Sequence, residues 1–275
     1  MFHQPAELGE ALAILGRGGC VPLSGGTDVF PALVDHPPVP LLDLSRIAGL
    51  RGVTRSENDV VFGAATTWTD IIRADLPPAF DALKQAAAQV GSIQIQNRAT
   101  VGGNLCNASP AADGVPPLLA LDAAVELASA HGKRVLPLGD FLRGNRSTAR
   151  APDELLVAIR VPRDIETAPS AFTKLGARKY LVISIVMIAA IVDVQDGMIR
   201  RARVAVGAAS AVARRLRALE DRLVGCAAAM DFTGMISTDE LADLSPIDDV
   251  RATAAYRLEA ARTLIARTLR QAVDA

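Results

Sequence analysis

Apolar and polar positions follow two different spacings along the chain, which predict both helices and strands. Residues 5–18 place apolar side chains at helical intervals and finish in Gly-Arg-Gly, which is typical of a short helix closed by glycine. Short apolar runs at 20–24, 41–44 and 59–65 lie between glycine- or proline-rich turns and predict strands. We therefore expect the chain to begin with a small α/β unit.

The later segments extend this mixed pattern. The stretch "TTWTDIIRA" begins a predicted helix, and residues 80–90 form an alanine-rich one. Residues 181–192 are continuously apolar and rich in β-branched side chains, which predicts a buried strand, because a membrane span needs about 20 residues. Residues 214–223 and 254–273 carry apolar side chains on one helical face, as packing helices do.

Composition narrows the class of protein. The chain has 275 residues, half of them apolar, and a net charge of −1. Since no strong electrostatic field of one sign is present, we expect no nucleic-acid partner. The longest apolar run is too short for a membrane span, so we expect none. The N-terminal residues lack the basic region of a secretory signal, which predicts a cytoplasmic protein.

Cysteines and histidines are few and scattered. The three cysteines form no C-x-x-C pair, so we expect no metal or iron-sulfur site on this chain. They are interpreted as buried or half-buried side chains, although Cys106 lies inside the richest motif. No nucleophile stands beside a histidine and no carboxylate pair is evident, so we expect no catalytic residue.

Two glycine pairs are the strongest motifs. The first is Gly25-Gly26, followed by Thr-Asp, and the second is Gly102-Gly103 in "TVGGN", followed by "NASPAAD". Two such loops offer backbone and hydroxyl donors without side-chain obstruction, which binding of a diphosphate requires. Each pair alone also occurs in ordinary turns. Asp113 is the type of acceptor that binds a ribose hydroxyl, but Asp before Gly is also common in turns.

These motifs together resemble a known family. The stretches "PLSGGTDVFPAL" and "RATVGGNLCNASPAADGVPPLLAL" resemble the two flavin-binding signatures of the FAD-binding (medium) subunit of the molybdenum hydroxylases, of the xanthine dehydrogenase and carbon monoxide dehydrogenase type. The stretch "FTKLGARKYLVISIVMIAAIV" and the segments after it resemble the C-terminal domain of that family. The resemblance covers essentially the full chain.

The resemblance implies an α+β fold with two domains. Residues 1–168 would form an FAD-binding domain of the vanillyl-alcohol-oxidase/PCMH-like type, made of two subdomains that divide near residue 55. Residues 169–275 would form a C-terminal flavoprotein domain, a small antiparallel sheet with packed helices.

The resemblance also implies a non-covalently bound FAD, since His3, His36 and His131 lie in no motif for a covalent flavin link. The family pattern implies three groups of FAD contacts. The pyrophosphate would contact Leu23, Ser24, Gly25, Gly26, Thr27, Asp28, Val29, Thr100, Val101, Gly102, Gly103 and Asn104; the ribose, ribityl or adenine groups would contact Ser109 and Asp113; and the flavin ring would lie near Lys174 and Ile183. An acidic residue that many relatives carry near Leu181 or Val182 is missing here.

The implied function is electron transfer inside a heterotrimer. A large subunit would carry the molybdenum cofactor, a small subunit would carry [2Fe-2S] clusters, and this chain would pass electrons through FAD to NAD or another acceptor. Purines, N-heterocycles, aldehydes and carbon monoxide all remain open as substrates. Two alternatives remain: a self-sufficient FAD-dependent oxidase or reductase, which the low aromatic content disfavours, and a non-enzymatic nucleotide-binding module, which the colour of the purified protein would distinguish.

Overall fold

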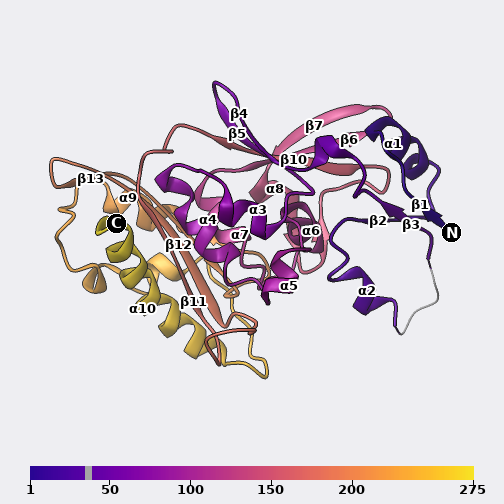
Figure 1. Cartoon of the computed structure of the whole chain (residues 1–275). Helices are drawn as coiled ribbons and strands as arrows, with labels where there is room; N and C mark the ends of the chain where they lie inside the picture. The colour runs from indigo at the N-terminus through magenta and orange to yellow at the C-terminus, as the bar shows by residue number, and fades with distance from the viewer. Residues whose placement is uncertain (35–38) are drawn as a thin grey trace.

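Three β-sheets and one two-stranded ribbon, with helices packed on them, form the α+β fold of the computed structural model, which describes residues 1–34 and 39–275 (Figure 1). The first sheet lies at one end of the molecule, and the sheet of the C-terminal part lies at the other (Figure 1). The predicted mixture of helix and strand is confirmed.

The first sheet is small and parallel, with the strand order β1-β3-β2. Its strands are β1 (Phe2–His3), β2 (Val21–Leu23) and β3 (Leu41–Asp43), and the helices of this unit are α1 (Leu8–Gly16) and α2 (Val29–Ala32). Helix α1 buries Ala11, Leu12 and Leu15, which are the apolar positions of its predicted inner face. The sequence therefore predicted this α/β unit correctly.

The second sheet is antiparallel, with the order β4-β5-β10-β6-β7. Its strands are β4 (Val53–Arg55), β5 (Asp59–Gly63), β6 (Ala124–Ser129), β7 (Gly132–Pro137) and β10 (Leu155–Pro162). The short helix η1 (Ala48–Leu50) precedes them, and between them lie α3 (Trp68–Arg73), η2 (Pro78–Phe80), α4 (Asp81–Ala87), α5 (Ile93–Gln96), α6 (Val101–Asn107), α7 (Val115–Ala120), α8 (Leu138–Phe141) and the ribbon strands β8 (Leu142–Gly144) and β9 (Ser147–Thr148).

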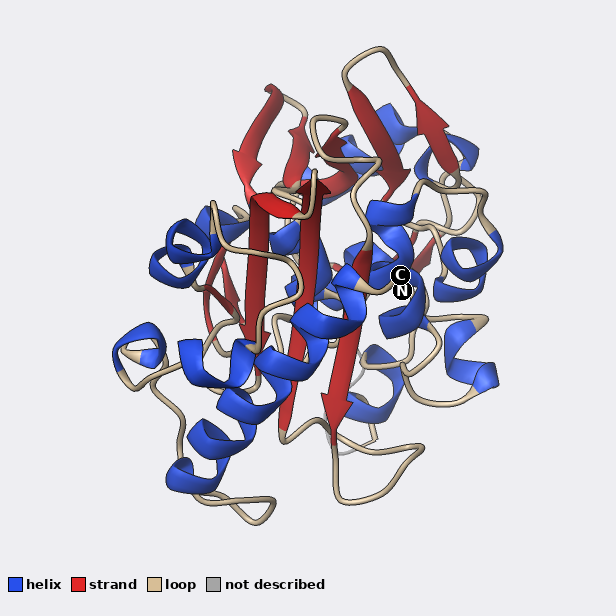
Figure 2. Cartoon of the chain, turned by 90° about the vertical axis from the view of Figure 1, so that its left-hand side faces the viewer, coloured by secondary structure: helices blue, strands red, loops and turns tan. Residues whose placement is uncertain are grey.

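The third sheet is also antiparallel, with the order β11-β12-β13-β14, and the long helix α10 crosses one of its faces (Figure 2). The elements of this part are β11 (Ser170–Leu175), β12 (Val186–Gln195), β13 (Met198–Gly207), β14 (Arg214–Arg215), α9 (Arg217–Leu223), η3 (Phe232–Met235), η4 (Asp239–Leu241) and α10 (Ala254–Val273).

Strand β12 explains the longest apolar run of the sequence. Met187, Ala189 and Ile191 pack into the core of the second sheet and its helices, whereas the alternating residues 186, 188, 190 and 192 pack into the core under α10. A strand buried on both faces needs apolar side chains at every position. The predicted strand began at residue 181, which is wrong by five residues, because residues 176–185 connect β11 to β12 and Leu181 in this connection has a left-handed φ of 51°.

Helix α7 joins the second and third sheets. All six of its residues are buried, and it packs against α4, β12, β13 and β14. Asp113 precedes the helix and pairs with Lys174 of β11 at 2.6 Å, and Asp122 follows it and pairs with Arg215 of β14 at 2.7 Å. Both ends of this short apolar helix are therefore bonded to the C-terminal sheet.

Candidate functional site

A cavity of about 320 Å³ brings the two glycine pairs together. It is lined by parts of β2 and β10, the turn after β2, Leu44 directly after β3, and the starts of α3 and α6. The predicted residues that line it are Ser24, Gly25, Gly26, Thr27, Asp28, Val29, Thr100, Gly102, Gly103 and Asn104. Leu23 and Val101 are buried and do not line this cavity, and Ser109, Asp113, Lys174 and Ile183 lie outside it.

Glycine is required in the first turn for two reasons. Gly26 has a φ of +76°, and a Cβ at this position would lie 2.5 Å from Cε2 of Phe30. A Cβ on Gly25 would collide with the carbonyl oxygen of Arg98, on the segment that leads to the second glycine pair. The first turn can therefore pack directly on the backbone before the second pair only because it lacks side chains.

The first turn has free backbone donors. Among the residues that the structure describes, no protein acceptor is bonded to the N–H groups of residues 24–28. The same five residues line the cavity. A run of unpaired backbone N–H groups in a turn forms a concave site for an anion.

The second glycine pair differs from its prediction, because it begins helix α6 and does not form a loop. The N–H groups of residues 101–104 all have acceptors, namely the carbonyl oxygens of Thr66, Ala64 and Thr100 and the side-chain oxygen of Thr100. Thr100 is the N-cap, and its hydroxyl accepts from the N–H of Gly103 at 3.1 Å. This pair therefore provides close packing and the Asn104 side chain, and its backbone donors are already used.

Gly102 shows what the close packing requires. A Cβ at this position would lie 2.6 Å from the carbonyl oxygen of Ala64 and 2.7 Å from its Cβ. Gly103 is less constrained, since an added Cβ would approach only Thr100 Oγ1, at 2.9 Å. The two glycines of this pair thus have different roles.

Trp68 is a cavity residue that the sequence did not single out. It opens α3 directly after Thr67, whose side chain accepts from the N–H of Asp70, while the Asp70 carboxylate accepts from the N–H of Thr67. Burial raises the pKa of the Asp70 carboxyl, but hydrogen bonds from Arg51 and Thr67 outweigh it and lower the pKa to about 2. The capping signal was recognised in the sequence, but the position of the indole in the cavity wall was not.

Two buried polar atoms belong to side chains that line this cavity. Trp68 Nε1 and Asn104 Oδ1 are both shielded from solvent, and neither has a partner among the described residues. Buried polar atoms are nearly always hydrogen-bonded in folded proteins. The N–H groups of the first turn, which have no acceptor among the described residues and belong to residues that line the cavity, fit a ligand that carries a diphosphate.

Asp113, Lys174 and Ile183 belong to a separate region. The buried carboxylate of Asp113 accepts from Lys174 Nζ at 2.6 Å and from Ser184 Oγ at 2.6 Å. Burial raises the pKa of the Asp113 carboxyl, while Lys174 and Ser184 act in the opposite direction. Ile183 precedes Ser184 and is exposed. Asp113 is thus bonded within the protein, whereas Ser109 accepts only from the N–H of Ala111, at 3.3 Å.

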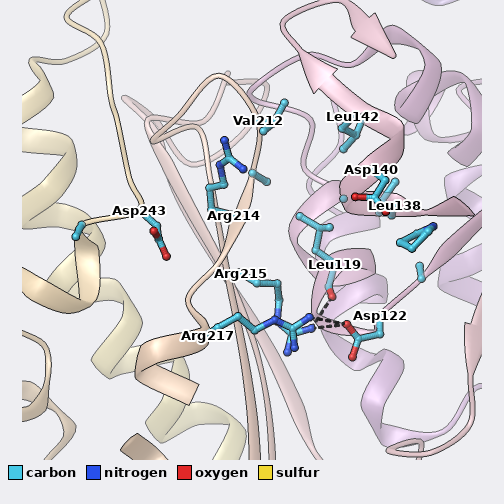
Figure 3. Close-up of a pocket in the computed structure, with 15 residues that line it drawn as sticks. Leu119, Asp122, Leu138, Asp140, Leu142, Val212, Arg214, Arg215, Arg217 and Asp243 are labelled. Atoms are coloured by element: carbon cyan, nitrogen blue, oxygen red, sulfur yellow. Dashed lines mark hydrogen bonds and ion pairs between the residues drawn. The ribbon is translucent and has the colours of Figure 1, made fainter. Parts of the chain in front are cut away.

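A second cavity, of about 910 Å³, lies between the α7–α8 region and the C-terminal part, and its lining includes Arg214, Arg215 and Arg217 (Figure 3). In the sequence these three arginines form a basic patch, for which a solvated face is favoured over a contact with a partner subunit. Arg215 is buried against Asp122 and the carbonyl oxygen of Leu119, as the dashed lines show (Figure 3). These bonds make Arg215 a structural residue. Arg217 approaches Asp122 at 3.3 Å, and Arg214 is exposed.

Cysteines and histidines do not cluster. In residues 1–34 and 39–275, no group of His, Cys, Asp and Glu could hold a metal ion, and His36 lies outside these ranges. Cys106 lines the smaller cavity, and burial raises the pKa of its thiol to about 11, so it is a neutral side chain at neutral pH. No helix in the described part is long and apolar enough to cross a membrane.

Comparisons with known proteins cover the whole length. The model of the FAD binding domain in molybdopterin dehydrogenase matches residues 1–164, and that of the CO dehydrogenase flavoprotein C-terminal domain matches residues 171–272. The chain is 31% identical over 280 residues to the xanthine dehydrogenase FAD-binding subunit of Escherichia coli O157:H7, covering 100% of this chain and 96% of that one. It is 34% identical over 244 residues to the nicotinate dehydrogenase FAD-subunit of Eubacterium barkeri, covering 84% and 81%.

A solved structure shows the same fold. The chain superposes on a chain of a crystal structure of Cu,Mo-CO dehydrogenase with a TM-score of 0.93 and 28% identity, covering 99% of this chain and 97% of that one. The predicted combination of an FAD-binding domain with a small C-terminal sheet is therefore confirmed.

Proposed function

Since the chain belongs to the family of FAD-binding subunits of the molybdenum hydroxylases, we propose that it takes electrons from iron-sulfur clusters of a partner subunit and passes them through FAD to NAD or another acceptor. The observation that carries the proposal is the cavity in which both glycine pairs meet and the first turn offers five N–H groups without an acceptor in residues 1–34 and 39–275.

The residues of the cavity fit FAD. The first turn would hold the pyrophosphate with its backbone donors, because the N–H groups of residues 24–28 have no acceptor among the described residues and these residues line the cavity. Asn104 and Trp68 also line this cavity. When bound, FAD supplies the oxidation and reduction chemistry of its flavin ring, and the protein supplies binding, orientation and the local field.

Residues outside the cavity would serve the rest of the cofactor. Lys174 and Asp113 form a buried ion pair, and we assign this pair to the region of the flavin ring and the ribityl chain, with Ile183 at the exposed rim. Ser109 is assigned to the ribose or adenine side. The Lys174 ammonium is held at one position by Asp113, so its charge would act on the flavin from a fixed place.

The partners are a large subunit with the molybdenum cofactor and a small subunit with [2Fe-2S] clusters, in a three-chain assembly in the cytoplasm. The relatives are named for xanthine, nicotinate and carbon monoxide, which supports the view that the substrate is chosen on another chain. The boundary between the two parts of this chain is placed near residue 168, which the start of β11 at Ser170 supports.

The test is reconstitution with and without partners. The full chain should be purified yellow, acid should release free FAD, and NADH should bleach the flavin if NAD is the acceptor. When this chain is co-expressed with the molybdenum and iron-sulfur chains, the substrate of the molybdenum chain should reduce the flavin. Omission of the iron-sulfur chain should abolish this reduction. Turnover of a purine or aldehyde by the lone chain without metal would contradict the proposal.

A further inference from the structure

The wall of the smaller cavity has no net charge, although its proposed ligand carries a negative charge on each phosphate. Among the described residues that line it, only Asp28 and Arg150 have charged side chains, and their charges cancel. The Arg150 guanidinium donates to the carbonyl oxygens of Ala151 and Glu154, whereas Asp28 stands in the first turn itself. A carboxylate beside a diphosphate weakens binding unless another cation offsets its charge.

Two hydrogen bonds connect Asp28 to a cation that lies outside the cavity lining. Asn107, the last residue of α6, donates from Nδ2 to Asp28 Oδ1 at 3.1 Å, and its Oδ1 accepts from Arg146 Nη1. Arg146 lies in the turn between β8 and β9, and no carboxylate of the described residues pairs with it. We call Asp28, Asn107 and Arg146 the Asp28 relay. The charge of its arginine is available to Asp28 and to a ligand beside it.

The backbone at Arg146 is unusual for an arginine. Arg146 has a φ of +56°, and its N–H donates to the carbonyl oxygen of Ala108, which has a φ of +46°. Asn145 and Arg146 connect the paired residues Gly144 and Ser147, and a positive φ at the second position of such a turn favours glycine. Arginine therefore stands here against the preference of the backbone, and residues strained in this way cluster at ligand sites.

We propose that Arg146 is a positioning residue of the diphosphate site, which acts through Asn107 to hold the Asp28 carboxylate and to offset its charge beside the bound ligand. The inference rests on the proposed FAD function. It explains how an acidic side chain can stand in a turn whose N–H groups have no acceptor among the described residues and face an anion. Without Arg146, the Asp28 carboxylate would repel the diphosphate.

The variant Arg146→Gly separates this role from a structural one. Glycine adopts a positive φ without strain, so the apo variant should resist urea at least as well as the original chain. The Kd for FAD should nevertheless rise about three- to tenfold, because Asp28 loses the cation that offsets its charge. This rise should shrink in about 1 M salt, where screening limits charge interactions to about 3 Å. An unchanged Kd would overturn the inference.

Adding Asp28→Asn to Arg146→Gly tests the charge directly. The neutral amide removes the charge that Arg146 offsets, so the Kd for FAD should return to within about twofold of the original value. A purely structural relay predicts no return, because the bond to Arg146 is missing from the double variant as well. A double variant that binds FAD as weakly as Arg146→Gly would therefore refute the role of the Asp28 charge.

Arg143→Gly is the matched control. Arg143 lies in β8 of the same ribbon, and its exposed side chain makes no hydrogen bond to the described residues. The substitution removes one positive charge and leaves the Asp28 relay intact, so the Kd for FAD should keep its original value. An equal loss of affinity in both glycine variants would trace the effect to the net charge of the protein and would overturn the role of the relay.

The two proposals fail in different ways. If the original chain does not bind FAD at all, the proposed function fails. If it binds FAD while Arg146→Gly retains the original Kd, or while Asp28→Asn does not restore it, only the role of the Asp28 relay fails.

Discussion

The two glycine pairs line one cavity, but only the first has backbone N–H groups left to offer a ligand. In the first turn, the N–H groups of residues 24–28 have no acceptor within the described residues. In the second pair, all four N–H groups of residues 101–104 are bonded inside the protein. The same dipeptide therefore provides donors in one place and close packing in the other.

The position of threonine explains the difference. Thr100 stands before the second pair, where its hydroxyl can accept from the N–H of Gly103 and begin a helix. Thr27 stands after the first pair, and the N-cap of the following α2, Asp28, makes no side-chain capping bond. A threonine two residues before a glycine pair thus favours a helix start, and a threonine after the pair leaves the turn open.

The largest effect is expected from Gly26→Val. A branched side chain cannot easily adopt the φ of +76° and would collide with Phe30. The Kd for FAD should rise by about 100-fold or more, which titration of the apo chain would measure. Gly19→Val is the matched control, because Gly19 has a φ of +78° but no atom near its Cβ position. If the control loses FAD equally, the effect comes from backbone strain alone.

Gly102→Ala should act on folding. The added Cβ would meet Ala64 at 2.6–2.7 Å, and overpacking of this kind costs about 1–3 kcal/mol of unfolding free energy. Urea denaturation of the apo chain measures this loss of unfolding free energy. An apo chain of normal stability that has lost FAD would contradict the assignment of Gly102 to packing.

Asp70→Ala should lower the unfolding free energy by about 1 kcal/mol, the usual cost of a lost helix cap, because Asp70 belongs to the capping box that begins α3. The pKa of Asp70 is lowered from 3.8 to about 2, so its stabilising effect is present above the unfolded value and is lost as pH falls through the folded value. The difference in urea midpoint between the two proteins should therefore be constant near neutral pH and should narrow below about pH 4. A difference that is unchanged at pH 3 would argue against a role for the charged carboxylate.

Gly103→Ala should have the smallest effect. Its backbone is helical and the new Cβ would approach only Thr100 Oγ1, so the unfolding free energy should change by less than about 0.5 kcal/mol. FAD affinity should fall far less than in Gly26→Val. An equal loss of FAD in both variants would remove the distinction between the two pairs.

Local patterns predicted most of the fold and part of the site. The α1 helix, strands β2 and β3 and the start of α3 depend on neighbours within a few residues, and the sequence predicted them, whereas the two-residue strand β1 was not predicted. The start of β12 was misplaced because a left-handed Leu181 gives no signal in an apolar run. Asp113 was interpreted as a cofactor ligand or a turn residue, since its partner Lys174 is 61 residues away. Trp68 was missed because an unpaired indole is visible only in three dimensions.

Helix α7 has a consequence for how the protein is made. Its six apolar residues are covered on one side by strands β12–β14, which leave the ribosome about 70 residues or more after the helix itself. Until those strands emerge, the nascent chain must expose this segment, together with the carboxylates of Asp113 and Asp122. The flavin site would therefore mature only after synthesis of the C-terminal sheet, and a ribosome-bound chain halted before β12 should need chaperones and should not retain FAD.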